Sequence, residues 1–183
     1  MPLIYRARWN AAEWGVWEIL ESESELWKSA SLSTNEERYV RRIAHPRRRL
    51  EALAARVLRD FLEGGAHFSL SHSFPWAAAI RAPHPVAIDI ERLRVFPAVE
   101  VYFMNNADFE LVSIENFTKW HVWCAKEVAY KLLCSRYDNL SFKREFSFLG
   151  EVVEFRRGND FHRIQVSFEE KEEWLVAIGR EIS

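Results

Sequence analysis

Two prolines separated by a single residue, Pro83 and Pro85, interrupt the chain near its middle. Proline fixes its own backbone and pushes the preceding residue toward extended conformations, so the segment 82–85 forms a short rigid link. A chain of 183 residues suits one domain of ordinary size, or two small halves that share a core. We therefore predict an N-terminal half, residues 1–84, and a C-terminal half, residues 85–183, that together form one compact unit.

The first half combines strand-like and helix-like patterns. Polar and apolar side chains alternate over residues 3–9, as in a strand. Ser22 and Ser33 each precede a glutamate by three residues, the spacing of a capping box that starts a helix. The elements expected here are a hairpin of residues 3–9 and 16–20, a helix from about residue 35 that stops before Pro46, a helix over 47–62, and strands over 68–73 and 76–80.

The second half is dominated by one long helical pattern over residues 117–134. Asn105 followed by Asp108 marks the start of a shorter helix before it. The other expected elements are strands over 86–91, 151–155, 162–168 and 173–178, with a turn at 157–160.

Composition excludes several classes of protein. Hydrophobic residues make up 49% of the chain and charged residues 28%, which indicates a folded globular protein rather than a disordered tail. The formal net charge is −2, so no overall field draws the chain to nucleic acid or to a membrane. The first residues lack an apolar segment of signal-peptide length, and no run reaches the roughly 18 apolar residues of a membrane span.

The two cysteines, Cys124 and Cys134, lie in the same predicted helix. Ten residues along a straight helix span about 15 Å, which is too far for a disulfide. We therefore expect two reduced thiols and a cytoplasmic protein.

The segment over residues 86–91, Val-Ala-Ile-Asp-Ile-Glu, carries the most informative chemistry. Side chains alternate along a strand, so Asp89 and Glu91 share a face with Ala87, at a Cα separation of about 6.6 Å. Two such carboxylates repel each other unless a cation lies between them, and Mg²⁺ commonly takes one or two carboxylates together with phosphate oxygens. The alternative is a half-buried strand whose acidic face is solvated. In either case we expect Asp89→Ala to leave the fold intact.

A third carboxylate, Glu127, lies one helical turn before Lys131. Residues four apart share a helix face, so this pair can present a metal ligand and a phosphate-binding ammonium together. The alternative is a surface ion pair that contributes about 0.3–0.5 kcal/mol.

Two further segments suit phosphate. His72 stands among serines at the end of an expected strand, where it can hydrogen-bond a phosphate or serve as a structural histidine. The three arginines of residues 47–49 open the last expected helix of the first half, and planar guanidinium groups match phosphate geometry. Arginines on the surface of a helix are also common, so this pattern is weak alone.

In chain order, these segments read RRRLEALAAR over 47–56, FSLSHS over 68–73, AIDIE over 87–91 and WCAKEVAYK over 123–131. This order resembles the 4′-phosphopantetheinyl transferase superfamily, in particular its longer, monomeric type that activates peptide and polyketide synthases. The family pattern is an Asp-x-Glu strand followed by Trp-x-x-Lys-Glu-x-x-x-Lys.

The resemblance implies an α+β fold of two similar α/β halves, a pseudo-dimer, each with a long helix on a small antiparallel sheet and with the active site between the halves. It implies that Asp89, Glu91 and Glu127 hold Mg²⁺ with the pyrophosphate of coenzyme A, and that Glu127 and Lys131 are the catalytic pair. The residues implied to bind coenzyme A are Arg47, Arg48, Arg49, His72, Lys126 and Lys131, with one or more of the arginines meeting the 3′-phosphate.

The implied reaction moves the 4′-phosphopantetheine group from coenzyme A to a serine of an apo acyl or peptidyl carrier protein, and 3′,5′-ADP leaves. The serine proton passes to Glu127 or to a metal-bound water. The implied partners are coenzyme A and an acyl carrier protein or a carrier domain of a synthase. The resemblance also implies that the chain acts as a monomer. For the acidic carrier we expect basic contacts from Arg41, Arg42 and the arginines of 47–49, and apolar contacts from Phe103, Met104 and Phe109.

The chain departs from the family pattern at three places. Ala87 stands where the family has glycine, and the gap between Asp89 and Trp123 is shorter than usual in the family, near the region expected to help dock the carrier. The stretch 63–67 is also short and lacks the lysine-bearing loop that helps the family to bind coenzyme A. The missing lysine loop favours an alternative in which the chain keeps a carrier- or nucleotide-binding surface without catalysis. A different Mg²⁺-dependent phosphoryl enzyme also fits the carboxylates, but it leaves the histidine and lysine segments unexplained.

Overall fold

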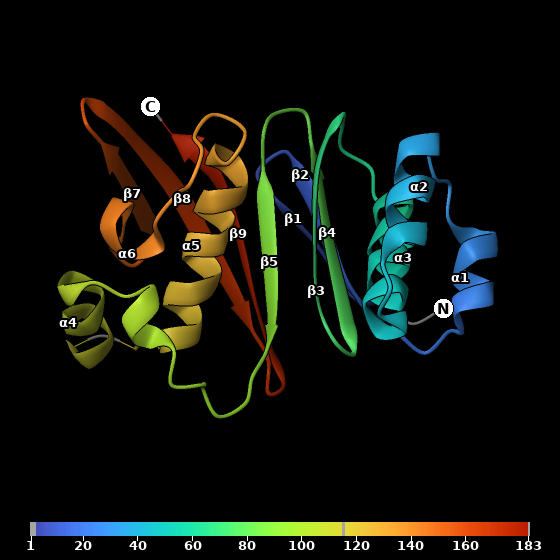
Figure 1. The fold of residues 1–183 in the computed structure, drawn as a ribbon, viewed down its shortest axis with the longest axis horizontal. Coiled ribbons are helices and arrows are strands. Elements are labelled where there is room, and N and C mark those ends of the chain that lie inside the picture. Colours follow the sequence, from blue (N-terminus) through green and yellow to red (C-terminus); the bar gives the residue numbers. More distant parts are fainter. Residues whose placement is uncertain (1–2, 115, 183) are drawn as a thin grey trace. The chain divides into compact units, whose positions relative to one another are not determined.

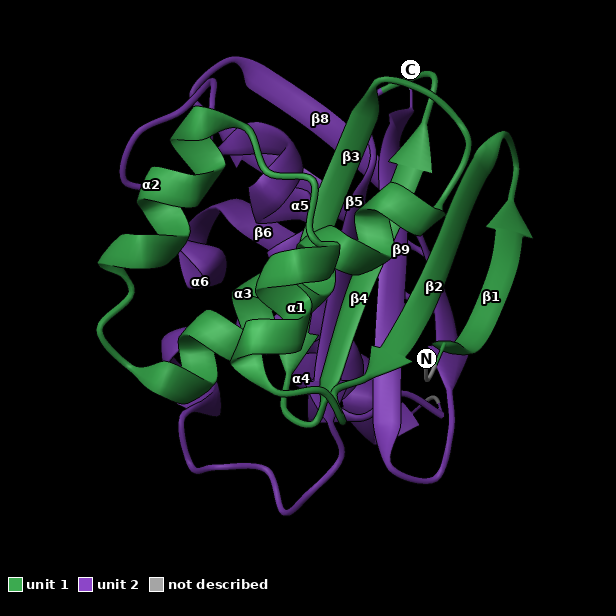
Figure 2. Cartoon of the chain, turned by 90° about the vertical axis from the view of Figure 1, so that its right-hand side faces the viewer, with its two compact units in different colours: residues 1–84 green, residues 85–183 purple. Residues whose placement is uncertain are grey.

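A computed structural model describes residues 3–114 and 116–182 of the chain. It confirms a mixed α+β fold in which both sheets are antiparallel (Figure 1). The chain divides into two compact units, Met1–His84 and Pro85–Ser183 (Figure 2). Each unit has its own hydrophobic core, so each is described by itself.

The sheet of unit 1 has the strand order β1-β2-β4-β3. The β1–β2 hairpin turns at Asn10, whose φ of 53° lies in the left-handed region that asparagine tolerates better than most residues. The second strand of the hairpin therefore begins at Ala12, earlier than the expected residue 16. The strands are β1 (Leu3–Trp9), β2 (Ala12–Glu18), β3 (His67–Ser73) and β4 (Trp76–Ala82).

Three helices precede β3: α1 (Glu23–Ser29), α2 (Thr34–Arg42) and α3 (Pro46–Phe61). The capping boxes expected at Ser22 and Ser33 are both present, so these two helix starts are confirmed. Helix α3 packs its apolar stripe on the sheet. Residues from this stripe, such as Leu53, Val57 and Leu58, share a core with Trp17 of β2.

The sheet of unit 2 has the strand order β5-β9-β8-β7-β6. The helix expected over 117–134 is α5 (Lys119–Leu133), and the start at Asn105 leads into α4 (Asn106–Ile114). Sequence analysis missed α6 (Phe142–Glu145) and β6 (Phe146–Phe148). The remaining elements are β5 (Ala87–Arg92), the 3₁₀ turn η1 (Glu100–Tyr102), β7 (Val152–Arg157), β8 (Asp160–Glu170) and β9 (Trp174–Ile182).

Helix α5 packs closely across β5 and β9. Gly179 of β9 permits this approach, because a Cβ there would lie 2.6 Å from Val128 Cγ1 and 2.7 Å from the carbonyl oxygen of Gln165. Cys124 of α5 is buried and Cys134 beyond it is exposed, and both are free thiols as expected. Among the described residues, no helix has both the length and the apolar character needed to cross a membrane.

Candidate functional site

Strand β5 directs its two carboxylates toward helix α5. Ala87, which shares a strand face with Asp89 and Glu91, packs in the core that α5 covers. Asp89 is only 5% exposed, so the alternative of a solvated acidic face is wrong for this residue. Ile88 and Ile90 point to the opposite face and are fully buried.

Lys131 reaches from α5 back to β5. Its ammonium donates to Asp89 Oδ1 and to the Ile88 carbonyl oxygen, each at 2.8 Å. The Lys131 contacts therefore differ from the simple surface ion pair with Glu127 that sequence analysis held as an alternative. The lysine neutralises a buried carboxylate of the strand instead.

Glu127 lies one turn before Lys131 and is half-buried. Burial raises the pKa of Glu127 from its ordinary 4.5 to about 7, with further contributions from the negative charges of Asp89 and Glu91 that Lys131 only partly offsets. Three carboxylates therefore act on one another across β5 and α5, and the charge of Lys131 only partly offsets their effect on Glu127.

Two neighbours on α5 hold the strand carboxylates. Trp123 Nε1 donates to Glu91 Oε1 at 3.1 Å. The Cys124 thiol hydrogen-bonds Asp89, and burial, together with the nearby charges of Asp89 and Glu91, raises the pKa of this thiol well above its usual range. Cys124 is thus a protonated, buried neighbour of the carboxylates and not a thiolate ligand or nucleophile.

The donor set of Asp89, Glu91 and Glu127 fits a hard divalent cation. All its donors are carboxylate oxygens, and the repulsion that Asp89 and Glu91 exert on Glu127 is the feature that a cation would remove. Over residues 3–114 and 116–182, no three His, Cys, Asp or Glu side chains form a closed ligand group by themselves. A Mg²⁺ ion needs only one or two protein carboxylates when phosphate oxygens complete its shell.

Lys126 does not belong to this cluster, so the expectation that it meets phosphate is wrong. Its side chain is wholly buried, and its ammonium donates to Asp108 Oδ2 at 2.5 Å and to the carbonyl oxygens of Phe103 and Phe142 at 2.9 and 3.0 Å. Burial lowers the pKa of Lys126, while the charge of Asp108 opposes this effect. An ammonium has three protons, and all three are used here.

An aromatic pocket of about 680 Å³ opens beside the carboxylates. Trp123 links the two, since it donates to Glu91 and also lines the pocket. The pocket was not predicted from the sequence, although the seven-residue spacing of Trp123 and Tyr130 on one helix face was a usable signal. Its lining includes Tyr102, Phe103, Trp123, Tyr130, Leu140 and Phe142.

Two of the residues expected to contact a carrier cannot do so. Phe103 is 2% exposed and Met104 is fully buried, because both pack into the core of unit 2. Phe109 is 39% exposed, so its contact with a carrier stays a prediction.

In unit 1, His72 is held by a buried acid. His72 Nδ1 lies 3.2 Å from Glu51 Oε2, and Glu51 is 5% exposed. Burial acts to raise the pKa of Glu51, but the hydrogen bond from His72 and the charges of Arg47 and Arg48 outweigh it, so this pKa is lowered. Because Glu51 contacts Nδ1, Nε2 is the ring nitrogen of His72 that remains for a ligand.

The three arginines of residues 47–49 differ in their contacts. Arg49 donates to Glu23 Oε1 at 2.6 Å and to the Ile43 carbonyl oxygen at 2.8 Å, so it serves the packing of α3. Arg47 and Arg48 have exposed side chains, and Arg47 lies over the Phe74 ring. Arg47 and Arg48 are therefore the arginines that remain suited to an external phosphate.

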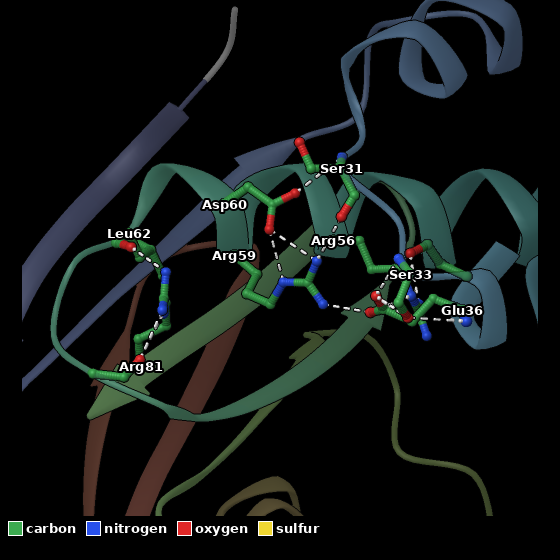
Figure 3. A network of polar contacts seen from close by, with 10 residues as sticks. Ser31, Ser33, Glu36, Arg56, Arg59, Asp60, Leu62 and Arg81 are labelled. Atoms are coloured by element: carbon green, nitrogen blue, oxygen red, sulfur yellow. Dashed lines mark hydrogen bonds and ion pairs between the residues drawn. The ribbon is translucent and has the colours of Figure 1, made fainter. Parts of the chain in front are cut away.

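Further along α3, arginines form an internal network (Figure 3). Arg59 donates to Glu36, to Asp60 at 2.8 Å and to the Ser31 carbonyl oxygen at 3.3 Å. Arg56 Nε lies 3.3 Å from Glu36 Oε1. This network fastens the α1–α2 connection and α2 to α3, so Arg56 has a structural role.

The short stretch 63–67, which lacks the expected lysine, is clamped to β4. Arg81 donates to the Leu62 carbonyl oxygen at 3.1 Å (Figure 3) and to the Gly65 carbonyl oxygen at 2.7 Å. Gly65 has a φ of +128°, and a Cβ there would lie 2.5 Å from the Ala82 carbonyl oxygen. This stretch is therefore a tight connection with no room for a larger side chain at Gly65.

Comparison of the chain with models of known protein families and with curated proteins finds no match.

Proposed function

We propose that this chain is a Mg²⁺-dependent 4′-phosphopantetheinyl transferase. The observation that carries the proposal is the arrangement of Asp89 and Glu91 on β5 against Glu127 and Lys131 on α5. Three interacting carboxylates with an ammonium among them suit the transfer of a phosphoryl-linked group, in which a cation and a lysine together balance phosphate charge.

The proposal includes a fold of two similar halves. In each unit, a long helix packs on an antiparallel sheet: α3 in unit 1 and α5 in unit 2. In each unit, the strand that precedes the helices also pairs with the last strand of that unit, as β2 does with β4 and β5 with β9. This shared order supports a pseudo-dimeric origin.

The site residues have distinct roles in the proposed reaction. Asp89, Glu91 and Glu127 would hold Mg²⁺, which supplies positive charge to the pyrophosphate of coenzyme A. Glu127 would also accept the proton of the carrier serine. The serine oxygen bonds to the β-phosphorus of coenzyme A, the bond from that phosphorus to the oxygen of 3′,5′-ADP breaks, and Lys131 stabilises the charge that develops.

The aromatic pocket would take the pantetheine chain of coenzyme A. The chain carries methyl and methylene groups between its amides, and a concave pocket of aromatic side chains with a few polar edges suits such a ligand. Because Trp123 contacts both Glu91 and the pocket, a ligand with phosphates at the carboxylates has an apolar surface next to it for its arm.

The residues of unit 1 supply the proposed phosphate and carrier contacts. His72 would donate to phosphate through Nε2, and Arg47 or Arg48 would meet the 3′-phosphate. Arg41 and Arg42 are exposed as well and would attract the acidic carrier protein.

Mass spectrometry of a carrier protein tests the proposal. The chain is incubated with an apo carrier protein, coenzyme A and Mg²⁺, and the carrier is expected to gain the mass of one phosphopantetheine. Asp89→Asn is the negative control, and Glu110→Gln, on an exposed position of α4, is the matched positive control. No mass gain with fatty-acid, polyketide and peptide carriers from the same cell would contradict the proposal.

A second candidate is a carrier- or nucleotide-binding module without catalysis. The clamped stretch 63–67, which has no lysine, favours it. Calorimetry separates the two candidates. Binding of coenzyme A that depends on Mg²⁺ supports the enzyme, whereas binding of the carrier without any binding of coenzyme A supports the module.

A further inference from the structure

Lys126 and Asp108 form the centre of a buried hydrogen-bonded hub in unit 2. Both side chains are fully buried. Asp108 also accepts through Oδ2 from the backbone N–H of Asn105 at 2.7 Å and through Oδ1 from the backbone N–H of Phe148 at 2.9 Å. The hub therefore joins α5 to the start of α4 and to β6, which are distant from one another in the sequence.

Two of the bonds made by Lys126 end on the walls of the aromatic pocket. The ammonium holds the backbone carbonyls of Phe103 and Phe142, and both of these residues line the pocket. Their rings stand edge-on to the Trp123 ring, with centroid distances of 5.2 and 5.7 Å. One ammonium thus fixes the two backbone segments that carry the rings around Trp123.

No other lysine contact described in unit 2 joins two walls of this pocket. Lys143, for example, donates to the Val101 carbonyl oxygen at 2.9 Å, but this contact is exposed, so water can replace it. A buried ammonium has no such substitute, and losing it frees two carbonyl groups and a carboxylate in a dry interior.

We infer that Lys126 is a positioning residue that sets the width of the aromatic pocket, and through the pocket the fit of the pantetheine chain. It acts through Phe103 and Phe142 and touches no phosphate. The assignment of the pantetheine chain rests on the proposed function, whereas the control of the pocket by Lys126 rests on the contacts alone.

The test separates the two halves of coenzyme A. Pantetheine carries the arm without phosphates, and 3′,5′-ADP carries phosphates without the arm. Lys126→Met combined with Asp108→Asn removes both buried charges together, which avoids an unpaired carboxylate. We expect this double variant to bind pantetheine roughly tenfold more weakly than the parent and to bind 3′,5′-ADP equally well. Lys143→Met, the matched control, should bind both as the parent does.

A ligand-free measurement makes the inference independent of the proposed function. In protein labelled with 5-fluorotryptophan, the fluorine resonance of Trp123, assigned with Trp123→Phe, should shift and broaden in the double variant. The resonances of Trp14 and Trp17 in unit 1 should stay unchanged. If the double variant does not fold, Lys126→Ala with added propylammonium replaces it, and the amine should restore the parent resonance.

Two results would overturn the inference. An unchanged Trp123 resonance would show that Lys126 does not position the pocket. A loss of 3′,5′-ADP affinity with unchanged pantetheine affinity would show that it acts on phosphate. If instead the Trp123 resonance moves as expected but the parent binds neither half of coenzyme A, the proposed function fails and the role of Lys126 in the pocket stands.

Discussion

The ammonium of Lys131 on α5 donates to the carboxylate of Asp89 on β5 at 2.8 Å, in a site where Asp89 is 5% exposed. The pair makes Asp89 part of the structure as well as of the proposed metal site. Substitution of either residue should therefore change stability together with function.

For Asp89→Asn, we expect loss of Mg²⁺-dependent transfer by at least roughly 100-fold. We also expect the free energy of unfolding to fall by about 1–3 kcal/mol, because Lys131 loses its charged partner. The sequence-based expectation that Asp89→Ala abolishes transfer and leaves the fold intact stays a prediction, to which the Lys131 contact adds a loss of stability. Transfer is followed by carrier mass and stability by denaturant unfolding without Mg²⁺. Normal turnover at limiting Mg²⁺ would show that Asp89 does not hold the metal.

Glu127→Gln and Lys131→Ala should have different effects on the Mg²⁺ affinity and on the transfer rate. Glu127→Gln keeps the size of the side chain but removes a metal ligand and a base, so both the Mg²⁺ affinity and the rate should fall. Lys131→Ala should leave Mg²⁺ binding largely in place and lower the transfer rate, since its charge matters most as the phosphoryl group moves.

Turnover measured against Mg²⁺ concentration distinguishes these two variants. Lys131→Arg should rescue only part of the rate, because a planar guanidinium does not replace a compact ammonium. Curves for all three variants that superimpose on the parent would remove most of the support for a catalytic role of α5.

The raised pKa of Glu127 predicts an unusual dependence of stability on pH. Between pH 4.5 and about 7, the folded chain keeps a proton on Glu127 that the unfolded chain releases. The contribution of Glu127 to the free energy of unfolding therefore decreases as the pH rises through this window, by at most about 3 kcal/mol.

Denaturant unfolding of the metal-free chain across this pH range measures the effect. Glu127→Gln should flatten the decrease, and Glu110→Gln should not. Added Mg²⁺ should stabilise the parent more at the upper end of the window than at the lower end. Identical pH profiles for the parent and Glu127→Gln would contradict the assignment.

The arginines of 47–49 should separate into two groups. Arg49→Met should lower stability through loss of the Glu23 contact, and it should not alter the affinity for coenzyme A. Arg47→Met or Arg48→Met should weaken coenzyme A more than its 3′-dephospho form, if that arginine contacts the 3′-phosphate. Calorimetry with both ligands provides the comparison. Equal weakening of both ligands would show that the arginine does not contact that phosphate.

Local signals predicted much of the fold. The capping boxes at Ser22 and Ser33 involve residues three positions apart, so they are readable from a short window and both were found. Residues 142–148 were missed, because long-range contacts define them. The side-chain amide of Asn105 donates to the Phe146 carbonyl oxygen, and the backbone N–H of Phe148 donates to Asp108.

Local sequence signals also predicted only part of the candidate site. Alternation along β5 correctly placed Asp89 and Glu91 on one face, but it gave no information about the burial of Asp89 under α5. Lys126 and Lys131 are five residues apart on a helix, which turns them about 140° from each other. Only the folded chain reveals that Lys126 points to Asp108, eighteen positions earlier in the sequence.

The clamp that Arg81 places on the Leu62 and Gly65 carbonyl oxygens has a consequence for the kinetics of binding. A stretch pinned in this way cannot fold over a nucleotide as a long loop does, so little conformational entropy is lost when a ligand arrives. The nucleotide would then be recognised by side chains of helices and strands that are ordered before it binds. Under the proposed function, a site beside a stretch pinned in this way would bind its ligand quickly and also release it quickly.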